Sequence, residues 1–378
     1  MPNGYAVPLL RGISAVTREN PARKLSPLGF LQMVLSSTDG SAELNSNNVN
    51  GHSRDLNVKF RRRILESQVK DNANGCSDGI THGYDEFALP ALQTRAISLW
   101  VPLSQIRQYE QDTSAWVGLG TVANPQGKVT RVMREMYELM VDTGQALLKS
   151  INTVLVTQMG TSFGVNTVTA NNAARALSFS LGTTGMNDAL VQMIADWREN
   201  ELMDQVMIVG NGPFANYDLI RQILSGQASA QGISQAALAN MIPRVWFDKD
   251  TRTVWGANHV GVFERGSVHF LHRLANAGNF ATDLGNSSFF TMTLPVSEYS
   301  SVSVENLDRL TLDVQVEEFD CATDLEINGE VTNTGGPGIL ITLSKQFTLF
   351  TKPTNLYQAA DPLFGTNGTL RYNITATP

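Results

Sequence analysis

The side chains that could bind a metal ion are a few histidines and one group of carboxylates. The five histidines are His52, His82, His259, His269 and His272. His269 and His272 lie three residues apart in a segment typical of a strand, and no HExxH motif or carboxylate at ligand spacing accompanies them. The sequence therefore predicts no metal site at the histidines.

The carboxylates near the C-terminal end could chelate calcium only if they followed a calcium-binding order. They are Glu317, Glu318, Asp320, Asp324 and Glu326. This run lacks the ligand order and the glycine of an EF-hand loop. We interpret it as a solvated strand edge, and we expect no cofactor.

Two glycine-rich turns could receive a phosphate group. Residues 118–123, GLGTVA, have the GxGxxA spacing of a dinucleotide loop, but Asn124-Pro125 follows at once and no acidic residue stands at the required distance. Residues 210–213, GNGP, lie between a predicted strand and a predicted helix, without a following GK[ST]. We interpret them as a tight strand-to-helix turn. An enzyme with an anion site at residues 205–224 stays as an alternative.

The sequence also lacks the motifs that usually position a catalytic nucleophile. No GxSxG elbow occurs, and the two cysteines, Cys76 and Cys321, lie far apart without a CxxC partner. A disulfide framework is therefore not supported, and a reducing compartment fits best. We predict no catalytic residue and a protein that is not an enzyme.

One basic cluster could instead make electrostatic contacts. Lys59, Arg61, Arg62 and Arg63 lie in a segment whose apolar residues alternate with polar ones, which predicts a half-exposed strand. The cluster could be a solvated ribbon face that discourages aggregation, or it could contact an acidic patch of a neighbouring copy or internal DNA. Both interpretations are open at this point.

Composition limits the class of protein. The chain has 378 residues, is 42% hydrophobic and 17% charged, and carries a net charge of −7. It can bury a sizeable core in two or more folding units. The acidic balance argues against a dedicated binder of nucleic acid or anionic membranes. Because no window of about 18 consecutive apolar residues occurs, we expect no contact with a membrane.

The element that must organise the chain is a long helix at about 128–159. Its apolar residues recur at the spacing of one helical face, interrupted only by Gly144. Upstream, Ser26-Pro27 predicts a short helix containing Phe30 and Leu31, which has little core of its own and must dock on something else. Segments at about 56–64, 84–89 and 94–101 predict an antiparallel ribbon.

Downstream of the long helix, the pattern changes to a compact α/β or α+β unit. Helices are predicted at 186–201, 215–224 and 234–241, with a strand at 205–209 and further strand-like pieces to about 272. Two long alternating strands follow, LTLDVQVEEFD and ILITLSKQFTLF. The fold class is therefore α+β.

This order of elements resembles the major capsid proteins of tailed bacteriophages, with the Hong Kong 97-type fold. The likeness is carried by VKFRRRILESQV, by the helix VMREMYELMVDTGQALLKSINTVL and by MIADWRENELMDQVMIVGNGPFANYDLIRQIL. NGTLRY and GILITLSKQFTLF are similar to capsid proteins of phages that infect gut Bacteroidota.

The resemblance implies a division of the chain and a role. Residues 1–50 would be an N-terminal arm, 51–115 an extended loop, 116–175 a peripheral domain with a spine helix, 176–300 an axial domain, and 301–378 return strands and the C-terminal segment. Identical subunits would form pentamers and hexamers of an icosahedral shell around double-stranded DNA.

The same resemblance implies partners and a location. Subunit contacts are expected at Lys59, Arg61, Arg62, Arg63, Phe30 and Leu31. Scaffolding, portal or decoration proteins are further expected partners, and packaged DNA would be touched only weakly. The location would be the virion, with assembly in the host cytoplasm. A minor virion or portal-associated structural protein is the alternative role.

Overall fold

The chain was studied as a computed structural model. It describes residues 28–37, 43–44, 57–61, 84–103, 125–180, 183–202, 206–211, 244–274, 287–296, 309–321, 325–327, 330–333, 336–355, 361 and 363–377. These residues form two compact units. The first draws on 93–151 and 272–347, and the second on 27–92, 152–271 and 348–378. The predicted mixture of helices and sheets is confirmed.

The predicted long helix is present as α4 (Pro125–Thr161). Its residues up to Ile151 belong to the first unit and the remainder to the second. The gap in its apolar face has a packing cause, because a Cβ at Gly144 would lie 2.4 Å from Leu294 Cδ1 and 3.4 Å from Leu343 Cδ2. Because residue 144 has no side chain, the neighbouring sheet can approach the helix closely.

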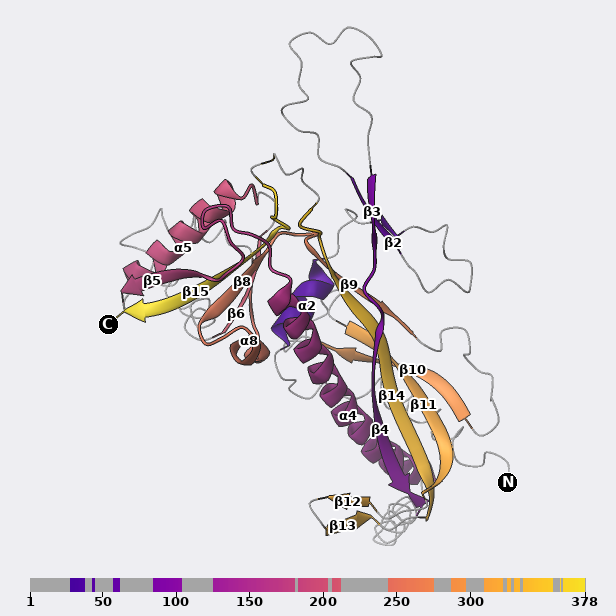
Figure 1. The fold of residues 1–378 in the computed structure, drawn as a ribbon. Coiled ribbons are helices and arrows are strands. Elements are labelled where there is room, and N and C mark those ends of the chain that lie inside the picture. Colours follow the sequence, from indigo (N-terminus) through magenta and orange to yellow (C-terminus); the bar gives the residue numbers. More distant parts are fainter. Residues whose placement is uncertain are drawn as a thin grey trace. The chain divides into compact units, whose positions relative to one another are not determined.

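That sheet has the strand order β10-β11-β14-β4 (Figure 1). Its strands are β10 (Ser287–Pro295), β11 (Arg309–Cys321), β14 (Gly336–Thr351) and β4 (Gln93–Pro102). Alternate residues of β11 and β14 are buried, which confirms the period of two. β12 (Leu325–Ile327) and β13 (Glu330–Asn333) form a separate pair.

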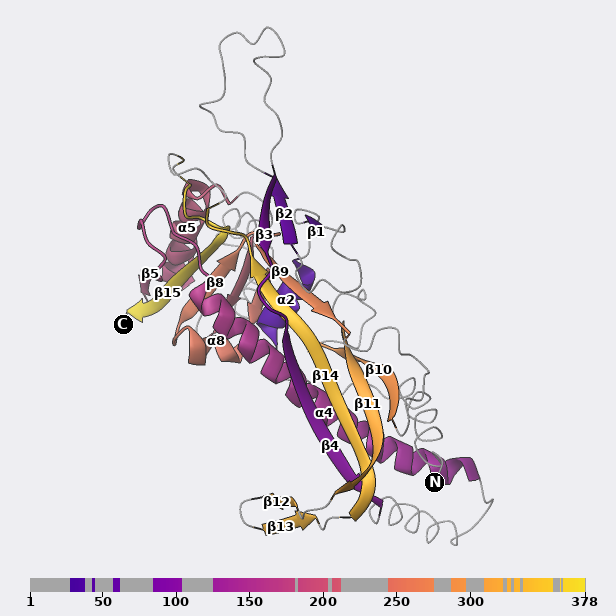
Figure 2. The same cartoon turned by 45° about the vertical axis from the view of Figure 1, so that its right-hand side comes forward.

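Part of the predicted ribbon lies within the described residues. β1 (Glu43–Leu44), β2 (Asn57–Arg61) and β3 (Tyr84–Ala88) form a three-stranded antiparallel sheet (Figure 2). β4 does not continue it but pairs with β14, Ile97 opposite Leu343 and Leu99 opposite Ile341. The apolar residues of β4 explain this choice, since they extend the hydrophobic face of β14.

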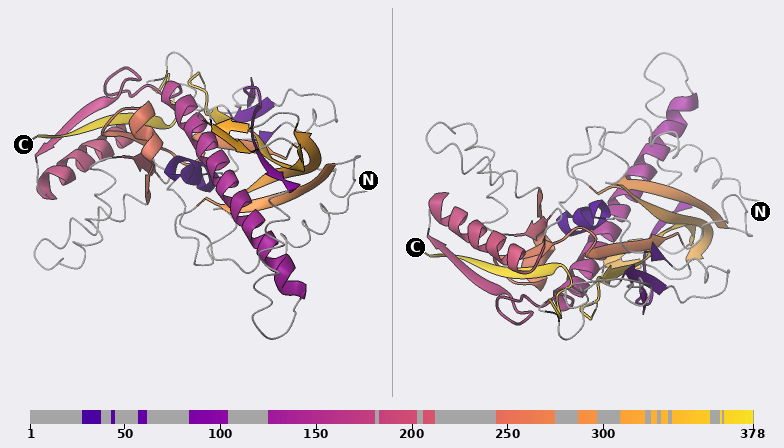
Figure 3. Two further views of the ribbon diagram at one scale, coloured as in Figure 1. Left: turned by 90° about the horizontal axis from the view of Figure 1, so that it is seen from below. Right: turned by 90° about the horizontal axis from the view of Figure 1, so that it is seen from above.

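The second unit contains a sheet with the order β5-β15-β8-β6-β7. Its strands are β5 (Arg175–Ser180), β15 (Thr369–Thr377), β8 (His259–Phe263), β6 (Met207–Gly210) and β7 (Arg244–Phe247). The predicted helix at 186–201 is α5 (Thr183–Glu199), which runs along β5 and β15 (Figure 3). Met193 and Trp197 of α5 belong to the same buried cluster as Ile208 and Tyr372.

Three smaller elements lie wholly or partly in the second unit. α2 (Gly29–Ser36) confirms the helix predicted after Pro27. β9 (Val268–Arg273) confirms a predicted strand; it pairs with β14 and passes into the first unit after Leu271. α8 (Lys249–Val254) lies where strand-like pieces were expected. It is a helix because Asp248 caps it, accepting a hydrogen bond from the Asp250 N–H. The helices predicted at 215–224 and 234–241 lie outside the described residues.

Candidate functional site

The basic cluster lies on the ribbon, where only part of it is described. Lys59 of β2 is half-buried, and its Nζ lies 3.1 Å from Glu86 Oε1 on the facing strand β3. Arg61 is the last residue of β2 and stands opposite Tyr84. The Arg61 side chain and both Arg62 and Arg63 lie outside the described part.

Among the described residues, one face of the ribbon packs against the rest of the second unit. Val58 and Phe60 are buried together with Phe350 of β14, and the Phe60 and Phe350 rings stack with centroids 5.7 Å apart. On β3, Phe87 packs edge-on against Phe60 at 6.1 Å. Residues of β3 that point the other way are exposed, including Tyr84 at 55%. The outer face therefore presents an aromatic ring and charges of both signs.

Phe30 and Leu31 lie on α2 and have no exposed surface. The Phe30 ring meets Trp255 edge-on at 5.9 Å and Phe263 at 5.7 Å. The helix was predicted to dock on another part of the protein, and it docks on residues of its own chain. A contact between subunits at these two positions would require both side chains to leave this site.

A buried polar network holds the first turn of α2. Asp248 Oδ2 accepts hydrogen bonds from the Phe30 N–H at 2.7 Å and from Asn152 Nδ2 at 3.0 Å. Asn152 Oδ1 in turn accepts from the Leu31 N–H at 3.0 Å. Burial raises the pKa of the Asp248 carboxyl to about 6, while the bonds from Phe30, Asn152 and Asp250 lower it.

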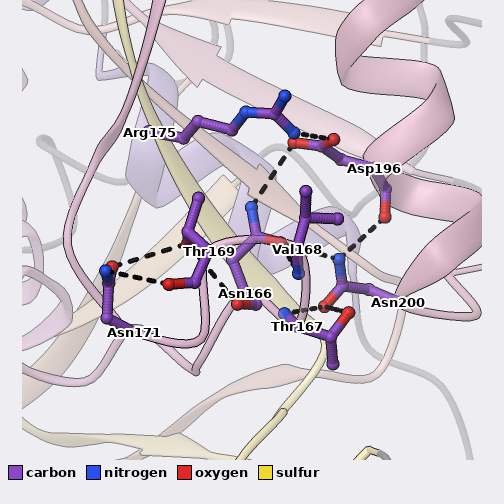
Figure 4. A network of polar contacts seen from close by, with 8 residues as sticks. All are labelled: Asn166, Thr167, Val168, Thr169, Asn171, Arg175, Asp196 and Asn200. Atoms are coloured by element: carbon purple, nitrogen blue, oxygen red, sulfur yellow. Dashed lines mark hydrogen bonds and ion pairs between the residues drawn. The ribbon is translucent and has the colours of Figure 1, made fainter.

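A second buried network, shown in Figure 4, joins the turn at 166–171 to α5. Asn200 Nδ2 donates to Asn166 Oδ1 at 3.0 Å and to the Asp196 carbonyl at 2.8 Å. Arg175 of β5 forms an ion pair with Asp196. Burial, followed by the Asp196 charge, raises the pKa of Tyr372 well above its ordinary range. The network uses its polar groups internally, which suits a structural role.

The candidate anion turn is occupied by internal bonds at its described residues. Asn211 is buried, its Nδ2 donates to Thr251 Oγ1 at 2.8 Å and its Oδ1 accepts from the Asn258 N–H at 3.1 Å. Gly212 and the helix expected after it lie outside the described residues, as do residues 118–123. The Asn211 side chain therefore holds the loop at Asn258 in place.

Among the described residues, no group of three or more histidines, cysteines or carboxylates could hold a metal ion. His269 and His272 both lie on β9, where a spacing of three places them on opposite faces. Glu317, Glu318 and Asp320 lie on β11. No helix in the described ranges combines the length and the hydrophobicity needed to cross a membrane.

Sequence patterns do not show which distant residues form the buried polar networks. Asp248 and Asn152 are 96 positions apart, and Asp196 and Asn166 are 30 apart. Asp248 alone had a local signal, since an Asp before a short polar run is typical of a helix N-cap. Its second role, at the start of α2, depends on tertiary contacts.

Comparison with known proteins gives a consistent set of structural similarities. The chain is similar over 94% of its length to the Cyanophage A-1(L) capsid asymmetric unit, with 11% identity, 96% of that chain covered and a TM-score of 0.45. The chain is also similar over 94% of its length to the capsid of Myoviridae phage XM1, with 11% identity, 95% of that chain covered and a TM-score of 0.42.

A third similar structure is the head of Helicobacter pylori bacteriophage KHP40, with 95% of this chain and 94% of that chain covered, 8% identity and a TM-score of 0.40. No family model and no curated protein matches the chain.

Proposed function

We propose that this chain is the structural subunit of an icosahedral viral shell. Many copies form pentamers and hexamers, which close around double-stranded DNA, and the subunit catalyses no reaction. In this proposal residues 1–50 act as an arm, 51–115 as an extended loop, 116–175 and 301–378 as a peripheral domain, and 176–300 as an axial domain. Assembly takes place in the host cytoplasm and the product is the virion.

The observation that supports the proposal is the one-sided attachment of the β1–β2–β3 ribbon. Its inner residues Val58 and Phe60 are 2% and 4% exposed, whereas Tyr84 on the outer side is 55% exposed. A two-stranded hairpin is marginal in water, and β1 adds only two residues to the pair formed by β2 and β3. A neighbouring copy that lies across the outer face would bury the second face and make the ribbon an interaction element.

Charge on the ribbon suits a specific contact between copies. Lys59 and Glu86 are partly exposed, with side-chain exposures of 31% and 45%. An ion pair with this exposure contributes little to the stability of one subunit. Across an interface, alternating charges fix the register of the partners and exclude wrong ones. We therefore place the subunit contact at Lys59, Arg61, Arg62 and Arg63.

The test is reversal of the three arginines, Arg61→Glu, Arg62→Glu and Arg63→Glu together. Purified wild-type protein is expected to form closed particles in negative-stain images. The triple variant is expected to remain as small oligomers, with a melting temperature within a few degrees of wild type. Assembly is measured by light scattering and folding by calorimetry.

A matched control changes the same net charge elsewhere. Arg198, Arg252 and Arg309 are exposed and lie outside the ribbon, so their reversal to Glu should leave assembly intact. Equal loss of assembly in both triple variants would show a general charge effect and contradict a ribbon contact. A wild-type protein that forms only rings, or stays monomeric under all conditions, would contradict the shell itself; rings would favour a portal-associated role.

A further inference from the structure

α2 lacks the features that would make it a helix by itself. It has 8 residues, no side-chain hydrogen bond from its N-cap residue Leu28, no acidic residue in its first turn and no basic residue in its last. Isolated helices shorter than about 12 residues are marginal in water even with good helix formers. The local sequence therefore cannot account for this helix.

The second unit supplies both missing parts of the N-terminal cap. The Phe30 N–H and the Leu31 N–H are two of the amides that a helix leaves without an internal partner. They donate to Asp248 and Asn152, which also bond to each other. A cap normally comes from the residue before the helix, but this one comes from positions 218 and 121 residues away.

The other end and the face of α2 are tied to the same unit. The Ser37 hydroxyl donates a hydrogen bond of 3.0 Å to the Val268 carbonyl oxygen. On the face of the helix, four apolar side chains are fully buried: Phe30, Leu31, Met33 and Val34. The approach at the N-terminal end is close, since a Cβ at Gly29 would lie 2.3 Å from the Phe247 carbonyl oxygen. Only a glycine fits there while the helix is docked.

We propose that Asp248 and Asn152 form a latch that makes the folding of α2 conditional on its docking. With the latch closed, α2 is helical and Leu28 is held at a fixed position on the second unit. With the latch open, residues 28–37 lose their helix while the strands of the second unit keep theirs. The inference does not depend on the role as a shell subunit.

Hydrogen exchange of the full-length, unassembled protein tests the latch through two variants that open it differently. Asp248→Ala removes the acceptor, and Gly29→Ala blocks docking by steric contact. In a self-sufficient helix, Gly→Ala would slow exchange or leave it unchanged, because alanine is the better helix former. We expect the amides of Phe30–Ser36 to exchange at least tenfold faster in both variants.

The controls separate the latch from general destabilisation. Asp250→Ala removes a neighbouring carboxylate that bonds Asn152 and Thr153 but leaves the Asp248 bond to Phe30, so exchange in α2 should stay within twofold of wild type. Exchange in β6 and β8 should be unchanged in every variant. Slow α2 exchange after either substitution, or equal acceleration in β6 and β8, would overturn the proposal.

Discussion

Lys345 is a lysine buried among the apolar side chains of its sheet. It is 1% exposed on β14, and its Nζ donates to the Thr311 carbonyl oxygen at 2.6 Å. Burial lowers the pKa of the Lys345 ammonium from 10.5 to about 8, and the Asp313 charge opposes this only in part. At neutral pH the folded chain therefore holds a buried cation at a cost in stability.

Replacement of this lysine together with Asp313, which is only 2% exposed, is expected to stabilise the protein, because no buried charge is then left without its counter-charge. Since the folded pKa is lower than the unfolded one, the unfolded chain binds more protons between about pH 8 and 10.5, and wild-type stability rises with pH across this window. Lys345→Met combined with Asp313→Leu should raise the free energy of unfolding at pH 7 by about 1–4 kcal/mol and abolish that rise.

Denaturant unfolding at pH 7 and pH 10 measures this effect. Lys149→Met on the exposed side of α4 is the control and should change stability by less than about 0.5 kcal/mol. A loss of stability in the double variant at pH 7 would show that the attraction between Lys345 and Asp313 and the bond to Thr311 outweigh the cost of burying the two charges.

At the residue scale, sequence patterns located polar residues but not their partners. The basic cluster was found because four cations lie within five positions, and Lys59 is indeed on a strand. Phe30 and Leu31 were expected at a subunit contact because their own segment offered no core. The Phe30 ring packs against Trp255 and Phe263, more than 220 positions away, and periodicity cannot reveal contacts at such separations.

At the scale of elements, the end of α4 is fixed by the turn that precedes β15. Asn367 Nδ2 donates to the Ser162 carbonyl oxygen at 2.8 Å, and Gly164 N–H donates to Thr369 Oγ1 at 3.1 Å. A Cβ at Gly164 would lie 2.8 Å from the Asn367 backbone nitrogen. Glycine therefore allows the two segments to touch.

Gly164→Ala should separate the end of α4 from this turn. We expect a loss of about 1–3 kcal/mol, the usual cost of overpacking, because a backbone atom cannot move aside as a side chain can. Thr157→Ala, an exposed position in the same helix, is the control and should be neutral or slightly stabilising. Thermal unfolding measures both, and an unchanged Gly164→Ala would show that the turn is easily displaced.

Elements with strong periodicity were predictable, and elements defined by pairing were not. α4, β11 and β14 follow their 3.6-residue or two-residue patterns over ten or more positions. β15 has a weaker pattern, and its parallel pairing with β5 joins segments about 200 residues apart. α8 was mistaken for strand because its cap outweighs the β-branched residues Thr251, Thr253 and Val254.

At the scale of the molecule, three of the described elements belong to both units. α4 passes from the first to the second between Ile151 and Asn152, and β14 does so between Phe347 and Thr348. β9 passes from the second to the first between Leu271 and His272. Continuous helices and strands transmit unfolding from one end to the other, because each hydrogen-bonded turn or pair depends on the next. The domain boundaries at 116, 176 and 301 stay predictions.

A proline at Ser150 should weaken this coupling. The residue is exposed, so the substitution removes a helix hydrogen bond at a cost of about 3 kcal/mol without disturbing a core. Wild type is expected to show one calorimetric transition and Ser150→Pro two, with Ser150→Ala behaving as wild type. A single transition at a lower temperature in Ser150→Pro would show that α4 does not carry the coupling.

The position of β15 also governs when the second unit can be completed during synthesis. This strand lies between β5 and β8, although it is the last of the described strands to leave the ribosome. At about 5–20 residues per second, β5 waits roughly 10–40 s for it. Until translation has passed residue 377, β5 and β8 therefore lack the strand that joins them, and their facing edges have no partner within this sheet.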